Sequence, residues 1–194
     1  MSTQAPLVPS ITSLILLSSD GSRLSSKYYS SFLLHANGPN SPETLQLRTN
    51  FEKQLHKKSR GKNGEIEILT VDQTTACYVT TSDLKIFLTS PSTESELVLS
   101  YVLDGFYSAL QQILHNQVDK RTILDNLELL MLLIDELSDS GRILETNPQM
   151  LAERVLMKQP GEGGDTPIGE LTIGQAFNQI AGQAREQIIA NMQN

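Results

Sequence analysis

The sequence predicts an α+β fold in which a five-stranded antiparallel sheet is flanked by helices. Short polar links separate strand-like apolar segments, and links of this length favour antiparallel neighbours. One helical segment follows the second strand, which gives the order β-β-α-β-β-β, and two long helical segments follow the last strand. A chain of 194 residues is long enough to bury one core.

The first two strands form a predicted β-hairpin over residues 11–29. An apolar run rich in branched residues precedes Asp20-Gly21, a strong turn signal because Gly accepts positive φ without steric cost. The first strand is apolar at nearly every position, as expected for a mid-sheet strand that is covered on both faces. The run between Pro9 and Asp20 is too short to favour the alternative, a buried helix.

The first helix is predicted to begin after Ser41, which acts as N-cap, with Pro42 at the first helical position. Its expected buried face is a narrow stripe with four-residue spacing, formed by Leu47, Phe51 and Leu55. Three strand-like segments follow at 65–71, 75–80 and 84–89. They complete the predicted sheet.

A long helix is predicted from 94 to about 117, with an apolar face broad enough to lie flat on the sheet. This face combines two rows: Leu97, Tyr101, Leu110 and Leu114, with Val98, Val102, Phe106 and Ile113. A second helix is predicted over 120–137 with the stripe Leu124, Leu127, Met131, Ile134 and Leu137. Gly141 is interpreted as the stop of that helix, and a short helix over 149–156 follows Asn147-Pro148.

The chain divides into four predicted regions. Residues 1–10 form a flexible tail, 11–158 the folded domain, 159–170 a linker rich in Gly and Pro, and 171–194 a C-terminal amphipathic helix. The last helix would be marginal alone in water, so we expect it to dock. It either folds back on the domain or binds a partner.

Composition excludes several classes of protein. With 22 acidic and 15 basic residues, the net charge of −7 disfavours nonspecific binding to nucleic acid or to anionic lipid. Cys77, the sole cysteine, rules out an intramolecular disulfide and fits a reducing compartment. The N-terminal apolar run stops after Leu17, so no signal peptide or membrane span is expected, and we predict a cytoplasmic protein.

The sequence contains no catalytic, cofactor or metal motif that we would assign. The glycines of the linker lack the following Lys-Ser or Lys-Thr of a phosphate loop, and the three histidines lack metal-binding spacing. Cys77 lies inside a strand, where a packed thiol is the expected role. Asp135 and Glu136 point about 100° apart on a helix, so they do not form a ready acid/base pair. A solvated helix end explains the presence of these two carboxylates more simply. A small enzyme built on these residues is the alternative from another class.

A basic run is the strongest candidate for a binding surface. Lys57, Lys58, Arg60 and Lys62 bring four positive charges into six residues of an acidic chain. A solvated loop is one interpretation. The other is an electrostatic contact with an acidic partner or with lipid headgroups, which contributes about 1 kcal/mol per charge at a membrane surface.

Several motifs follow one another along the chain: Asp20-Gly21-Ser22-Arg23-Leu24-Ser25-Ser26-Lys27-Tyr28-Tyr29, Phe51-Glu52-Lys53, Val118-Asp119-Lys120-Arg121, Ile134-Asp135-Glu136-Leu137, the run from Gly141 to Pro148, and Ala184-Arg185-Glu186-Gln187-Ile188. In this order they resemble the zeta-subunit family of coatomer, the coat of COPI vesicles. The resemblance covers residues 11 to 190 and departs from the family in the 37–42 loop and in the linker.

The resemblance implies a longin-like (SNARE-like) fold, with the sheet between one helix and a helical pair. It also implies a non-enzymatic coat subunit without cofactors. Such a chain would form a heterodimer with the coatomer gamma subunit in the heptameric coat, through an interface above ~2,000 Å². An Arf-family GTPase would recruit the coat to Golgi membranes for retrograde and intra-Golgi transport, so membrane association would come through the complex alone.

The alternative within the same architecture is a sigma chain of a clathrin adaptor, which helps to bind dileucine signals. The resemblance places the pocket-wall positions at Tyr107, Gln117, Lys120 and Thr122. These are bulkier and more polar than the apolar sigma pocket, so we expect no dileucine binding there. Tyr107, Lys120 and Arg121 join the basic run as candidate partner-binding residues.

Overall fold

Five strands form one antiparallel sheet in the order β2-β1-β5-β4-β3. The computed structural model describes residues 9–29, 41–60 and 62–157; the predicted linker and C-terminal helix lie outside these residues. The strands are β1 (Ser13–Ser18), β2 (Arg23–Tyr28), β3 (Ile66–Val71), β4 (Thr74–Thr80) and β5 (Leu84–Pro91). This confirms the predicted sheet and its opening hairpin.

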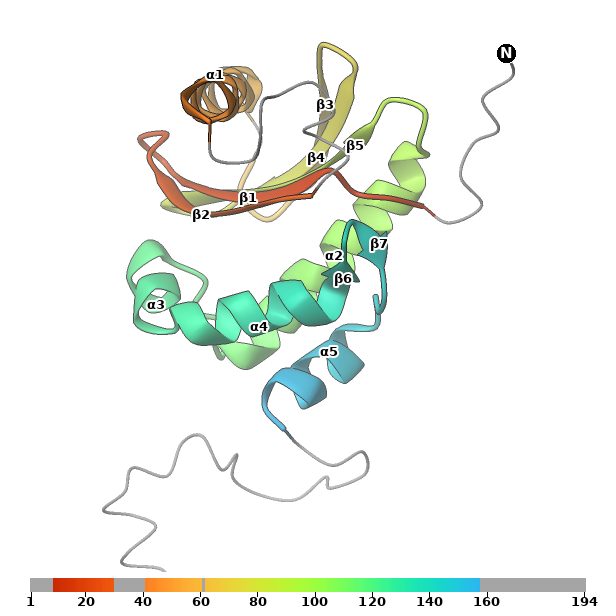
Figure 1. Cartoon of the computed structure of the whole chain (residues 1–194). Helices are drawn as coiled ribbons and strands as arrows, with labels where there is room; N and C mark the ends of the chain where they lie inside the picture. The colour runs from red at the N-terminus through yellow and green to blue at the C-terminus, as the bar shows by residue number, and fades with distance from the viewer. Residues whose placement is uncertain (1–8, 30–40, 61, 158–194) are drawn as a thin grey trace, which may run out of the picture.

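Strand β1 is buried along its whole length because helices cover both faces of the sheet. Leu14 and Leu16 join the core cluster under helices α2 to α5, whereas Ile15 and Leu17 join the cluster under helix α1. The prediction of a mid-sheet strand covered on both faces is therefore confirmed. Figure 1 shows α1 on one side of the sheet and the other helices on the opposite side.

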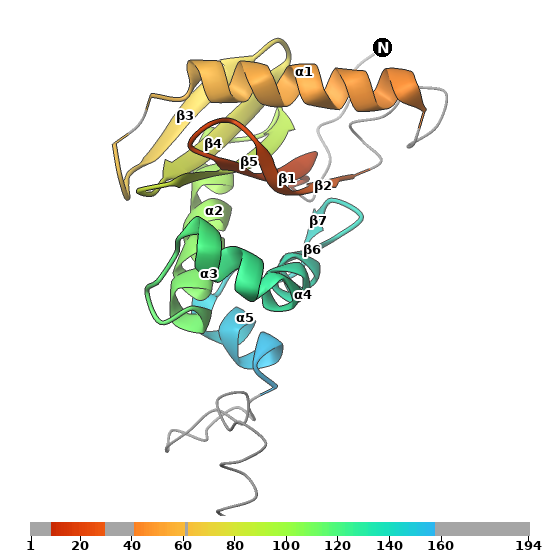
Figure 2. The same ribbon diagram turned by 90° about the vertical axis from the view of Figure 1, so that its left-hand side faces the viewer.

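Helix α1 (Pro42–Lys58) crosses the outer face of the sheet, as Figure 2 shows. Ser41 caps it, since its Oγ accepts a hydrogen bond from the Thr44 N–H at 3.2 Å. The prediction for Leu47 is wrong, because this side chain is 58% exposed. Residues spaced four apart on an α-helix are offset by about 40° around the helix axis, so a row of them drifts off one face. The buried residues are Thr44, Phe51, Glu52 and Leu55, so the prediction is correct at Phe51 and Leu55 and Leu47 lies outside the buried face.

The predicted helix over 94–117 is α2 (Glu96–Ile113), and it packs flat under the sheet through Val102, Leu103 and Phe106. Its predicted row is correct at Leu110 and Leu114 but wrong at its start, where Leu97 and Tyr101 are 78% and 62% exposed. Leu99, which the pattern did not single out, is buried instead.

The predicted helix over 120–137 is two helices, α3 (Lys120–Asp125) and α4 (Leu127–Leu137). Asn126 breaks the run with φ −122° and ψ 35°, and its side-chain Nδ2 donates to the Thr122 carbonyl at 2.9 Å. Within α4 the buried face centres on Leu130 and Leu137, and at 100° per residue Leu127 and Met131 lie to the side of that face. Leu124, Leu127 and Met131 are 47%, 39% and 42% exposed, whereas the buried positions are Ile123, Leu130, Leu133, Ile134 and Leu137.

Gly141 has the predicted positive φ of 84°, but it does not stop a helix. Helix α4 ends at Leu137, and Gly141 follows Ser140, with φ 50°, in the turn of a small hairpin of β6 (Ser138–Asp139) and β7 (Arg142–Ile143). Two consecutive positive φ values are typical of the tight hairpin turn. The carbonyl of Gly141 accepts a hydrogen bond from the Ile11 N–H at 2.8 Å.

The short C-terminal helix of the described part is α5 (Pro148–Val155), which packs against α2 and α4. The Asn147 side chain caps it by accepting from the backbone N–H groups of Gln149 and Met150. At the other end of the chain, Ser10 donates from its N–H and Oγ to the Glu94 carboxylate, at 3.3 and 3.2 Å.

Candidate partner-binding surfaces

The hairpin that carried the resemblance is bonded to α1 through a buried carboxylate. Glu52 is 5% exposed and accepts hydrogen bonds from Arg23 Nε at 2.9 Å and from Tyr28 Oη at 2.7 Å. Burial and the Glu52 carboxylate raise the pKa of Tyr28 above its usual range. A buried carboxylate is tolerated when it is paired and hydrogen-bonded in this way. Arg23, Tyr28 and Glu52 therefore hold the helix to the sheet edge.

The same hairpin is bonded to the opposite layer by Lys27 and Tyr29. Lys27 forms an ion pair with Asp135 of α4, and the Tyr29 hydroxyl is hydrogen-bonded to Ser138 Oγ. Burial raises the pKa of Tyr29. Successive strand residues point to opposite faces, so Tyr28 faces α1 while Tyr29 faces α4. The Lys-Tyr-Tyr motif thus joins the layers, a structural role that the sequence alone did not reveal.

The basic run ends α1 and begins the segment leading to β3. Lys57, Lys58 and Arg60, with Gln54, line an open hollow of about 540 Å³. Lys58 Nζ also donates to the Thr70 carbonyl at 2.9 Å. Lys62 does not line the hollow. Its backbone N–H donates to Glu67 Oε1 at 3.2 Å.

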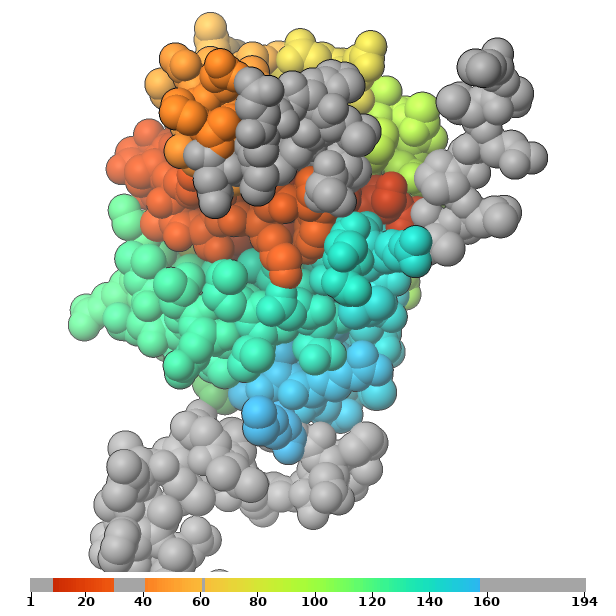
Figure 3. All heavy atoms as spheres, in the orientation of Figure 1, coloured from red at the N-terminus to blue at the C-terminus, as the bar shows by residue number. Residues whose placement is uncertain are grey.

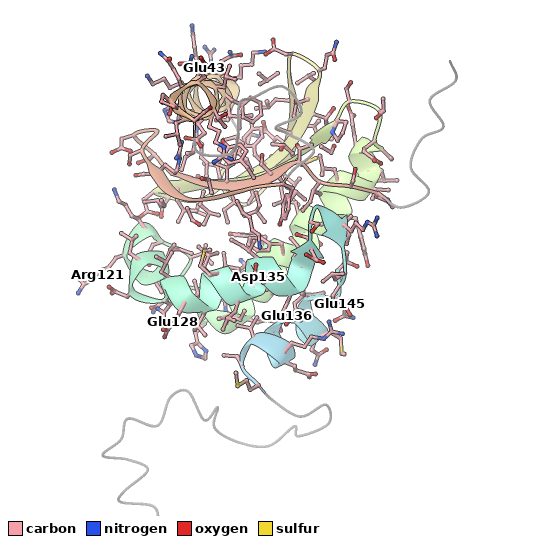
Figure 4. All side chains as sticks on the ribbon, viewed as in Figure 1. Glu43, Arg121, Glu128, Asp135, Glu136 and Glu145 are labelled. Carbon is pink, nitrogen blue, oxygen red and sulfur yellow. The ribbon has the colours of Figure 1, made fainter. Side chains whose placement is uncertain are left out.

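The candidates on the helical pair lie on the opposite face of the sheet from α1, as Figure 1 shows. Tyr107 is half-buried on α2, and burial raises its pKa. Lys120 is bonded inward, from its N–H to Asp83 Oδ2 at 3.0 Å and from Nζ to Ser18 Oγ at 3.4 Å. Arg121 lies at the outer end of α3 in Figure 4, with its side chain 90% exposed. Of these residues, Arg121 is the most accessible to a partner.

Large apolar side chains are exposed beside both free edges of the sheet. We define the α2 patch as Ile68, Leu97 and Tyr101, which are 44%, 78% and 62% exposed. Ile68 pairs with Cys77 across β3 and β4, and the Cys77 thiol lies 3.9 Å from the Glu96 carbonyl in the first turn of α2. These contacts place Ile68 on the face of the sheet that the first turn of α2 covers.

The second group lies beside β2, the other outer strand. We define the α4 patch as Leu124, Leu127, Met131 and Leu132, which are 39% to 47% exposed. Ser25 Oγ of β2 lies 3.8 Å from Met131 Sδ. Figure 3 shows β2 and α4 as adjoining parts of one visible face. We treat these exposed apolar side chains as a candidate protein–protein contact.

Two carboxylates beside α5 are paired with one arginine. Figure 4 shows Glu136 and Glu145 on the side of the molecule where α5 packs, and Arg154 approaches both carboxylates at 3.5 Å. Within the described ranges no cluster of three or more His, Cys, Asp or Glu side chains could hold a metal ion. Among those residues, too, no helix is both long and apolar enough to span a membrane.

Cys77 is a packed thiol, as predicted. It is fully buried in the core between the sheet and α2, and burial raises its pKa to about 12. The reactive form of cysteine is the thiolate, which this environment disfavours. Asp135 is engaged by Lys27 on the surface of α4.

Comparison with known proteins identifies the relatives of the chain. A family model described as clathrin adaptor complex small chain matches residues 10–161. Coatomer subunit zeta-1 of Oryza sativa subsp. japonica is 37% identical over 186 residues, which are 95% of this chain and 97% of that protein. Coatomer subunit zeta-1 of Homo sapiens is 32% identical over 183 residues, 94% of this chain and 93% of that protein.

The fold is similar to that of a chain in a homology model of the full-length AP-3 complex in a stretched open conformation. The superposition has a TM-score of 0.52 at 15% identity and covers 75% of this chain and 90% of that chain. At this identity the likeness concerns the fold. Together with the sheet and its helices, it confirms the predicted longin-like architecture.

Proposed function

The chain belongs to the clathrin adaptor complex small chain family, with coatomer zeta subunits among its relatives, and from this premise we propose that it is a non-enzymatic small subunit of the COPI coat. The similarity to coatomer subunit zeta extends over nearly the whole of both chains, and this observation carries the proposal. In this role the chain binds and stabilises the coatomer gamma subunit.

The two apolar patches support a large protein partner. Strands β2 and β3 form the outer edges of the sheet, and each has exposed apolar side chains of the helical layer beside it. Fully burying a Leu, Ile or Met side chain contributes about 1.5–3 kcal/mol. An obligate interface of above ~2,000 Å² would cover both patches.

Membrane attachment in this proposal comes from the assembled coat. An Arf-family GTPase recruits the complex to the cytosolic face of Golgi membranes, where the coat serves retrograde and intra-Golgi transport. The net charge of −7 supports this indirect attachment, because it disfavours nonspecific binding of the chain to anionic lipid.

The test is co-expression of the tagged chain with the gamma subunit, followed by affinity capture. We expect Leu97→Asp with Tyr101→Asp, or Leu127→Asp with Met131→Asp, to lower recovery of the gamma subunit at least tenfold, since a buried carboxylate without a partner is costly. The matched control is Leu45→Asp with Leu47→Asp on α1. These leucines are 46% and 58% exposed but lie on the opposite face.

Three results would contradict the proposal. Equal recovery of the gamma subunit with all three double variants would show that neither patch contacts it. Loss with the α1 control would show a general effect of acidic substitutions. Capture from cytosol of the large chain of a clathrin adaptor, in place of coatomer chains, would favour a sigma-type small chain.

A further inference from the structure

The hollow at the end of α1 concentrates positive charge on an acidic protein. Its lining combines Lys57, Lys58 and Arg60 with the amide of Gln54, and no acidic side chain of the described residues lines it. Within that part of the chain, none of the three cations forms a salt bridge. The hollow is open to solvent and has a volume of about 540 Å³.

The backbone that carries these cations is held in place by side chains of strands β4 and β5. Lys85 of β5 donates from Nζ to the Ser59 carbonyl at 2.8 Å and to Ser59 Oγ at 2.9 Å. The Arg60 N–H donates to Tyr78 Oη at 3.2 Å. A backbone that is already ordered lowers the entropic cost of binding, because the ligand does not have to order its own site. The charges are therefore presented together rather than on a free loop.

The carboxylate that contacts this segment is already engaged. Glu67 Oε2 accepts from Tyr78 Oη at 2.7 Å, and Oε1 accepts from the Lys62 N–H at 3.2 Å. Both bonds come from groups other than the three cations, and no ion pair within the described residues joins Glu67 to Lys57, Lys58 or Arg60. The carboxyl end of α1 offers no free N–H groups and carries a partial negative charge. An anion must therefore be bound by the side chains.

We propose that this hollow binds a small anion that carries several phosphate groups, of the kind found in the headgroup of a phosphoinositide lipid. The Arg60 guanidinium can contact a phosphate through two N–H groups, and the two lysines supply point charges. A concave site of this size suits a compact polyanion better than an extended acidic peptide. The site is independent of the apolar patches that the proposed function assigns to the large subunit.

The test compares full-length chains by isothermal titration with inositol 1,4,5-trisphosphate and by sedimentation with vesicles. One vesicle set contains phosphatidylcholine with a phosphoinositide, and the other contains phosphatidylserine at equal total charge. The test variant is Lys57→Gln with Arg60→Gln, which spares the Lys58 contact to β3. The control is Arg142→Gln with Arg154→Gln, which removes the same charge from exposed sites outside the hollow.

We expect the wild-type chain to prefer phosphoinositide vesicles over phosphatidylserine vesicles, with affinity that falls as salt rises. The test variant should bind about 25-fold more weakly, because each cation near an anionic surface contributes roughly a factor of five. The control should stay within twofold of the wild type. Binding of the soluble anion without vesicle binding would support the site and identify a soluble ligand.

Equal binding by the test and control variants would overturn the proposal. So would equal affinity for the two vesicle sets, which indicates diffuse attraction rather than a site. No anion binding, combined with weaker capture of coat proteins by the test variant, would show that an acidic protein occupies the hollow. Recovery of the gamma subunit is measured in parallel, so failure here leaves the proposed function separately testable.

Discussion

Replacing Gly105 by Ala tests the packing between α2 and the segment that leads into α5. Gly105 is buried in α2, and a Cβ at this position would lie 2.1 Å from the carbonyl oxygen of Thr146. Carbon–oxygen contacts rarely fall below about 3.3 Å, so the two backbones would have to separate by roughly 1 Å. Neither of them is a flexible side-chain end that could move away at low cost.

The sign of the effect separates two explanations of this glycine. If Gly105 were an ordinary helix position, Ala would raise the free energy of unfolding by about 1 kcal/mol. Overpacking costs about 1–3 kcal/mol, and here the upper value applies because backbone meets backbone. The net expectation is a loss of about 2 kcal/mol, or roughly 4–8 °C in Tm for a chain of this size.

The assay is urea unfolding followed by far-ultraviolet circular dichroism, since the chain has no Trp. Asp104→Ala, at the exposed neighbouring position, controls for helix propensity and should be neutral or stabilising. Gly64 has φ 79° but open space around the position of a Cβ. Gly64→Ala should therefore lower the free energy of unfolding by about 1–2 kcal/mol from backbone strain alone. A Gly105→Ala chain as stable as the wild type would refute the close contact with Thr146.

Two further predictions concern buried groups. Glu52→Gln should lower the free energy of unfolding by about 1–3 kcal/mol, because Arg23 and Tyr28 lose a charged acceptor. The control Asp135→Asn, at an exposed ion pair, should lower it by less than about 1 kcal/mol. Equal losses in urea unfolding would contradict the role of burial. Cys77 should react with iodoacetamide at pH 8 only after unfolding, and fast labelling of the native chain would disprove its packing. Since folding raises its pKa from 9.0 to about 12, its contribution to stability is full below about pH 9 and is lost as the pH rises towards 12.

The candidate site was predicted in part. The clustering of Lys57, Lys58 and Arg60 was visible in the sequence because these residues are neighbours in the chain. Their arrangement around a hollow was not, since its rigidity depends on Lys85 and Tyr78 from two later strands. The Glu52 network joins residues 24 and 29 positions apart and left no local pattern.

The sequence by itself determined the features that depend on neighbouring residues. Apolar runs and short links specified five antiparallel strands, Ser41 and Asn147 specified the caps of two helices, and Asp20-Gly21 specified the first hairpin turn. These elements follow from backbone sterics and local hydrogen bonds, which need no distant partner.

Only the tertiary structure decided which of several apolar faces is buried. Two rows of α2 are apolar, one beginning at Leu97 and one at Val98. Hydrophobicity alone could not predict which residues in the first turns of the helix would pack against the sheet. Asn126 could have continued a helix, and Gly141 could have ended one. The role of Gly141 depends on its contact with Ile11 and Tyr29 of the hairpin, more than 100 positions earlier in the chain. Contacts at that separation are made by packing, which a single sequence does not display.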